Sequence, residues 1–278
     1  MKIPSDASVI TRRTALSAGL MSVSALAAAC ASKNTTGGAG SVSASSSAPN
    51  EALASASTQV AATSPSRAAG CAVLTAEQEQ GPYYYAAAKV RQDITDGKLG
   101  APMQLKLSVI DVTTCQPVPD AAVDVWMADA LGDYSDTSTG LFLRGLQLTD
   151  STGIATFTAI YPGWYPSRTN HVHVKVHVGG TAGSTYSGGH VTHTGNLFFP
   201  EEVSVAVANV APYTSNPTKS RVPLTQDFVY RGQNGSGSIM KLTATDPSSP
   251  AKGYVAELTL GIDINATPAA IGISGTVN

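Results

Sequence analysis

Three histidines alternate with valines in residues 171–178, which read His-Val-His-Val-Lys-Val-His-Val. Successive side chains of a β-strand point to opposite faces, so the histidines would share one face and the valines the other. His171 and His173 would then be neighbours, and two imidazoles at this spacing can bind one metal ion. His177 would lie about 13 Å beyond His173 at the rise of a strand, too far to join them. Because His-x-His pairs also occur without a metal, the pattern alone is a weak signal.

Two loops supply further side chains that could complete a metal site. Residues 161–169, Tyr-Pro-Gly-Trp-Tyr-Pro-Ser-Arg-Thr, place Tyr165 and Arg168 directly before the histidine strand. Tyr134 follows an expected strand at 122–127. Two phenolates and two imidazoles form a hard, anionic ligand set that suits ferric iron better than zinc or copper. A fixed guanidinium beside such a metal can stabilise negative charge that develops on a substrate.

The elements that would position these residues are short strands. Alternating hydrophobic residues and the turns between them predict strands at 104–112, 122–127, 141–148, 154–160, 170–178 and 255–262. Short strands separated by turns rich in Gly and Pro are typical of a sandwich or barrel. The sequence therefore predicts one all-β domain over residues 71–278, with no helix longer than two or three turns.

The motif Pro-Gly-Trp-Tyr-Pro-x-Arg-Thr-x-His-x-His at 162–173 resembles the intradiol ring-cleaving dioxygenases, the protocatechuate and catechol dioxygenase superfamily. The similarity spans most of residues 71–262 and is closest to exported, single-domain members of the family. It includes the stretches 74–75, 79–84, 126–134, 142–145, 149–150, 161–178 and 197–200. The resemblance implies a β-sandwich of mainly antiparallel strands with long active-site loops, and a catalytic domain at 71–278.

The same resemblance assigns roles to individual residues. It implies a non-haem Fe(III) ion bound by Tyr134, Tyr165, His171 and His173. It implies that Arg168 stabilises the reacting ring and that Tyr165 accepts a substrate proton. The reaction would cleave a catechol-type diol with O2 to a cis,cis-muconate-type diacid. Asn196 stands where the family commonly has glutamine, and we expect Asn196, Trp164 and Leu131 to contact the substrate.

Residues 1–29 have the features of an export signal. Arg12 and Arg13 precede an apolar run at 15–29 that is too short to span a bilayer as a helix. A twin arginine in that place is typical of a Tat-type signal. The run ends Leu-Ala-Ala-Ala-Cys and resembles a lipobox, so we expect a lipoprotein tethered to the membrane through a lipidated Cys30. Simple cleavage after an Ala-x-Ala site is the alternative. Either way the protein would be exported, to the cell surface or the extracellular space.

Residues 30–70 are expected to form a disordered linker. Of residues 31–70, 29 are Ala, Ser, Thr or Gly and none is aromatic, so too little apolar surface is available to offset the entropy of ordering. Cys71 and Cys115 then remain in the domain. In an exported protein such a pair more often forms a disulfide than a metal or redox site.

Composition and charge limit the partners. The 278 residues carry a formal net charge of −2, which leaves no surplus of Lys and Arg to neutralise phosphates. A nucleic-acid-binding function is therefore excluded. The expected partners are a small-molecule catechol and O2. The sequence lacks the long N-terminal helical dimerisation segment that is typical of cytoplasmic catechol dioxygenases, so we expect a monomer.

Two other functions fit some of the same residues. His171, His173 and either His190 or His193 could form a three-histidine zinc site with an open water position. Under the iron hypothesis, His190 and His193 are instead solvated residues of a loop rich in Gly, Ser and Thr. A non-catalytic exported sandwich could also bind an extracellular aromatic or polymer ligand through Trp164 and the tyrosines.

Overall fold

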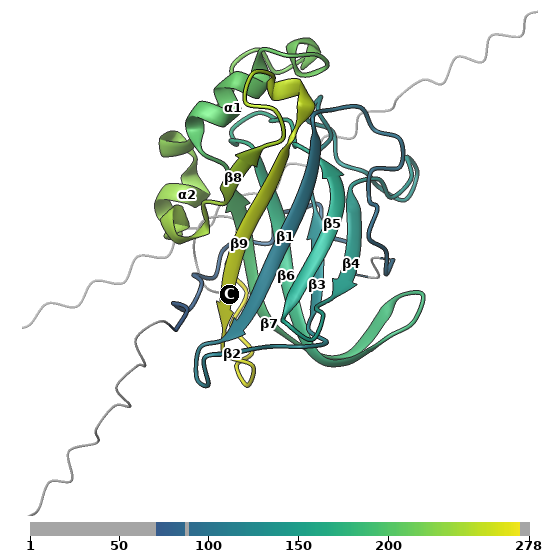
Figure 1. Ribbon diagram of the computed structural model, residues 1–278, viewed down its shortest axis with the longest axis vertical. Coiled ribbons are helices and arrows are strands. Elements are labelled where there is room, and N and C mark those ends of the chain that lie inside the picture. The colour runs from purple at the N-terminus through teal and green to yellow at the C-terminus, as the bar shows by residue number, and fades with distance from the viewer. Residues whose placement is uncertain (1–70, 87–88, 273–278) are drawn as a thin grey trace, which may run out of the picture. The chain divides into compact units, whose positions relative to one another are not determined.

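The structure, a computed structural model, describes residues 71–86 and 89–272 (Figure 1). The expected signal at 1–29, the linker at 30–70 and the proposed lipidation site Cys30 lie outside the described residues. Within the described part of the chain, no helix is both long and apolar enough to cross a membrane.

The described strands form two sheets (Figure 1). The first sheet has the order β2 (Gln116–Pro117), β1 (Pro102–Asp111), β9 (Tyr254–Ile262) and β8 (Lys241–Ala244), with β5 (Ile154–Ile160) also paired to β1. The second sheet has the order β4 (Arg144–Leu148), β3 (Ala122–Trp126), β6 (His171–Ala182) and β7 (Tyr186–Phe198). All of these strand pairs are antiparallel except β1 with β9. The predicted all-β sandwich of mainly antiparallel strands is confirmed.

The hydrophobic core lies between the sheets and is built from alternate residues of their strands. The β6 valines Val172, Val174 and Val176 are fully buried in one cluster with Leu105 and Leu107 of β1. Removing such side chains from water is the main force that holds the two sheets together. The valine face of β6 therefore packs into the core, and the histidine face points away from it.

Among residues 71–86 and 89–272, helices are few and short. They are α1 (Glu201–Ala208) and α2 (Phe228–Gly232), with single 3-10 turns at η1 (Tyr213–Ser215), η2 (Leu224–Gln226), η3 (Gly235–Ser238) and η4 (Pro250–Lys252). Asp227 begins α2, because its side chain accepts hydrogen bonds from the backbone N–H groups of Val229 and Tyr230.

The structure has the strands β2, β7 and β8 where the sequence predicted none. Residues 154–160 are a strand with the predicted ends, whereas in the range 141–148 only Arg144–Leu148 is a strand. The expected loop around residues 190–193 is wrong, since these residues belong to the 13-residue strand β7. Glycines weaken the strand pattern of this segment, but pairing with β6 along almost its whole length compensates for it.

Cys71 and Cys115 form the expected disulfide, with a Cα–Cα distance of 5.1 Å. The bond joins the first described residue to the turn after β1 across a sequence separation of 44. A crosslink of this loop length limits the unfolded chain and should stabilise the fold by about 4 kcal/mol.

Replacing both cysteines by serine is therefore expected to lower the free energy of unfolding by about 4 kcal/mol. Urea unfolding under non-reducing conditions measures this loss. Under a strong reductant the wild-type and double-serine proteins should be equally stable. A difference that persisted there would assign the loss to the serines rather than to the missing crosslink.

Candidate metal centre and active site

The two candidate histidine ligands lie where the strand pattern predicts, on the face of β6 opposite the core valines. His171 pairs with Phe198, and His173 lies between Trp126 on β3 and Asn196 on β7. Both imidazoles are buried, and their Nε2 atoms are 3.1 Å apart. Two nitrogens facing each other at this distance can bind the same ion.

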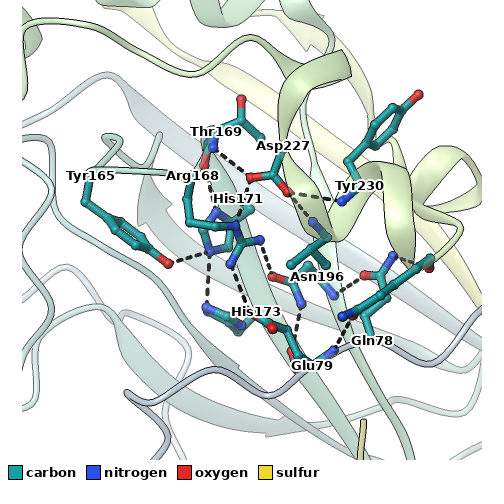
Figure 2. Close-up of polar contacts among 12 residues, drawn as sticks. Gln78, Glu79, Tyr165, Arg168, Thr169, His171, His173, Asn196, Asp227 and Tyr230 are labelled. Carbon is teal, nitrogen blue, oxygen red and sulfur yellow. Dashed lines mark hydrogen bonds and ion pairs between the residues drawn. The ribbon is translucent and has the colours of Figure 1, made fainter. Parts of the chain in front are cut away.

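Both candidate tyrosine ligands bring their hydroxyl groups to the same point. The hydroxyl oxygens of Tyr134 and Tyr165 each lie 3.4 Å from Nε2 of His171. The two tyrosine rings meet edge to face, with centroids 5.6 Å apart. Figure 2 shows Tyr165 reaching the histidine pair from its loop. Two loops and one strand thus gather all four predicted ligands around one position.

The protonation of His171 favours a metal at this position. Its Nδ1 lies 2.7 Å from the carbonyl oxygen of Thr169, which can only accept, so Nδ1 carries the proton. The lone pair on Nε2 therefore faces His173 and the tyrosine hydroxyls. Burial lowers the pKa of both His171 and His173, with help from the positive charge of Arg168, and keeps the imidazoles neutral. Neutral imidazole is the form that binds metals.

The donor types fit ferric iron. In the described part of the chain, no group of three or more His, Cys, Asp or Glu could hold a metal ion. A metal bound beside the two histidines would therefore need the phenol oxygens. Burial raises the pKa of both Tyr134 and Tyr165, so forming two phenolates here requires a strongly charged cation. A trivalent ion with nitrogen and oxygen ligands meets both conditions.

The three-histidine zinc site does not match the strand register. His193 pairs with Val176 and His190 with Val178, which places both on the valine face, away from His171 and His173. The expectation that His193 is solvated is also wrong. Its side chain is 1% exposed, and its Nδ1 lies 2.6 Å from Oε1 of Glu77. His190 is half-buried, with Nε2 3.1 Å from the carbonyl oxygen of Ile264.

Arg168 is fixed beside the site by several acceptors (Figure 2). Its Nε donates to Oδ2 of Asp227 at 2.8 Å and one terminal nitrogen donates to Oδ1 of Asn196 at 2.9 Å. The other terminal nitrogen is 3.5 Å from a carboxylate oxygen of Glu79. Burial alone would lower the pKa of Arg168, but the negative groups around it, with Tyr165 and Asp227 foremost, raise it. The guanidinium therefore keeps its charge and a single orientation.

Asp227 and Glu79 both contact Arg168, and neither was predicted from the sequence as part of the site. Asp227 is fully buried and accepts from the backbone N–H of Thr169 as well as from Arg168, 59 residues away. In the sequence it shows only the features of a helix cap. Glu79 is also buried, and burial raises the pKa of its carboxyl while Arg168 opposes the shift.

The three expected substrate contacts have different surroundings. Asn196 is fully buried, and its Nδ2 donates to the carbonyl oxygen of Glu79 while its Oδ1 holds Arg168. Trp164 packs in the hydrophobic core and donates from Nε1 to the carbonyl oxygen of Thr218. Leu131 is half-buried in the loop after β3. The polar groups of Asn196 and Trp164 are thus engaged inside the protein.

Comparison with known proteins shows similarity to dioxygenases. A family model described as "Dioxygenase" matches residues 79–185, which contain the four candidate ligands and Arg168. An intradiol ring-cleavage dioxygenase from Tetranychus urticae is similar in structure, with a TM-score of 0.63 and 29% sequence identity over 71% of this chain and 98% of that one. The chain is thus similar in sequence to this dioxygenase family over residues 79–185, and similar in structure to an intradiol ring-cleavage dioxygenase.

A second structure similar to this chain is the dioxygenase domain of a dioxygenase carbohydrate-binding protein fusion from Streptomyces sp. SirexAA-E. Its TM-score is 0.50, with 26% identity over 69% of this chain and 99% of that domain. The comparison with curated proteins found no match. Both of these similar structures are of dioxygenases, and the first is named as an intradiol ring-cleavage dioxygenase.

Proposed function

We propose that this protein is a non-haem Fe(III) intradiol dioxygenase that cleaves a catechol-type diol with O2 to a cis,cis-muconate-type diacid. The iron ligands are Tyr134, Tyr165, His171 and His173. The observation that carries the proposal is the convergence of the other three ligands within 3.4 Å of Nε2 of His171. When bound, the iron supplies a Lewis acid that lowers the pKa of the diol hydroxyls and orients the ring.

Tyr165 is the residue that the resemblance to intradiol dioxygenases assigns to take a proton from the substrate. It is half-buried, whereas the two histidine ligands are buried. Burial raises the pKa of its phenol, as it does for Tyr134, and a phenolate with a raised pKa is a stronger base than one in water. We assign to Tyr165 the acceptance of one of the two diol protons.

Arg168 stabilises the ring that reacts. Its guanidinium stays charged, so it can stabilise negative charge on a ring carbon without giving up a proton. Its three acceptors hold it in place before substrate arrives, and no reorganisation is then required during the reaction.

The same proposal includes export by a Tat-type signal and a lipid tether at Cys30. It also includes a location at the cell surface or outside the cell, and a monomeric state. The Cys71–Cys115 disulfide supports the compartment, since such bonds persist in oxidising surroundings.

Oxygen-electrode assays over a panel of catechols, with product absorbance recorded in parallel, test the function. The purified protein should contain iron, have a red to burgundy colour and convert a catechol to the intradiol product. A colourless protein with stoichiometric zinc would favour a different metalloenzyme. An extradiol product would refute the ligand set, and the absence of O2 uptake over the whole panel would favour a binding protein.

A further inference from the structure

The two histidine ligands are held in different ways. His171 donates from Nδ1 to the carbonyl oxygen of Thr169, which fixes the plane of its ring. Nδ1 of His173 is buried and has no hydrogen-bond partner among the described residues. Metal-binding histidines almost always donate their second N–H to an acceptor that orients the ring. The orientation of His173 must therefore come from another source.

One source is the indole of Trp126. This residue lies directly opposite His173 on the neighbouring strand β3, where cross-strand side chains meet. The two rings stack with centroids 4.9 Å apart and an interplanar angle of 1°. Trp126 is itself 1% exposed, and the ring of Tyr84 packs against it at 4.8 Å. A flat, immobile surface thus covers one face of the imidazole.

The second source is the backbone at Gly81. A Cβ atom at this position would lie 3.0 Å from Cε1 and 3.5 Å from Nε2 of His173, so any side chain here would press on the ring and make it shift by a few tenths of an ångström. Gly81 also has a φ of +71°, which L side chains rarely adopt. The segment before Tyr83 therefore closes against the imidazole edge that carries the ligating nitrogen.

We propose that Trp126 and Gly81 form a clamp that sets the ring plane of His173 and so aims its Nε2 at the metal, replacing the missing hydrogen bond. Both are positioning residues, because they touch the ligand and not the reacting atoms. The inference depends on the proposed function only in taking His173 as a metal ligand.

Gly81→Ala tests the clamp, and Gly97→Ala is the matched control. Gly97 has a similar φ of +77°, but nothing lies within 4 Å of a Cβ placed there. Both substitutions carry a similar backbone cost of about 1 kcal/mol, and only the Cβ atom of Gly81→Ala would press against His173. We expect Fe(III) affinity, measured by competition with a chelator, to fall on the order of 10- to 100-fold for Gly81→Ala. Gly97→Ala should bind iron like the wild type.

Trp126→Phe and Trp126→Leu provide a second test. Phenylalanine keeps a flat ring against the imidazole and should lose less iron affinity than leucine. The tyrosinate-to-iron absorption band should shift in the same order. Iron affinities of Gly81→Ala and Trp126→Leu equal to that of Gly97→Ala would overturn the clamp.

A measurement without metal separates the clamp from the proposed function. In metal-free protein with 13C-labelled histidine, relaxation of the His173 ring should indicate a rigid ring in the wild type and in Gly97→Ala. The ring should be mobile in Trp126→Leu. A wild-type protein that bound no iron but kept a rigid ring would refute the proposed function and leave the clamp standing. A ring that was equally mobile in every variant would refute the clamp itself.

Discussion

His173→Ala is expected to abolish iron binding, and His177→Ala is expected to leave it unchanged. Both residues lie on the same face of β6, but only His173 faces Nε2 of His171, at 3.1 Å. His177 is half-buried four residues further along the strand and contacts Tyr186. Loss of the metal removes several kcal/mol of transition-state stabilisation, so kcat should fall by at least about 10³-fold.

Iron content and the visible charge-transfer band measure this effect, with His177→Ala as the matched control on the same strand. Tyr165→Phe should change the band, since one phenolate is removed while both histidines stay. Full iron content and an unchanged band in His173→Ala would show that the ligand set is wrong.

Arg168→Gln is expected to lower kcat by about 10²- to 10³-fold while the iron content stays at the wild-type level. Loss of one well-placed group that stabilises developing negative charge has an effect of this size. The same substitution leaves the buried carboxylate of Asp227 without its cation. An unpaired buried charge destabilises a protein by about 3–5 kcal/mol, so the melting temperature should fall as well.

The double variant Arg168→Gln with Asp227→Asn separates the two effects. Removing the unpaired charge should restore part of the lost stability, because the introduced asparagine can still cap α2 through its side-chain oxygen. Activity should stay low, because the guanidinium is still missing. If activity returned together with stability, Arg168 would only hold the fold, and its catalytic role would be refuted.

Much of the site could be predicted from the sequence, because its main features are local. The alternation in residues 171–178 separates histidines from valines through strand geometry alone, and the structure keeps that division. Tyr165 and Arg168 lie within six residues of His171, so chain connectivity keeps them near it. Tyr134 comes from a distant loop, and the family resemblance was needed to assign it as a ligand.

The residues that hold the site in place could not be predicted in this way. Asp227 and Glu79 reach Arg168 from segments 59 and 89 residues away, and nothing in their local sequence indicates these ion pairs. The strand β7 looked like a loop because its glycines have low strand propensity, until pairing with β6 ordered it. His193 was misplaced for the same reason.

Strand periodicity and a compact motif thus determined, from the sequence alone, which face of β6 carries the ligands and which residue types surround them. Only the tertiary structure decided how His173 and Arg168 are oriented: Trp126 stacks on His173, Gly81 lies against its edge, and three acceptors surround Arg168. The physical reason is the sequence separation between the residues that determine each feature. A strand's alternation is fixed by its own backbone, whereas ring stacking and buried ion pairs depend on which distant segments the folded chain brings together.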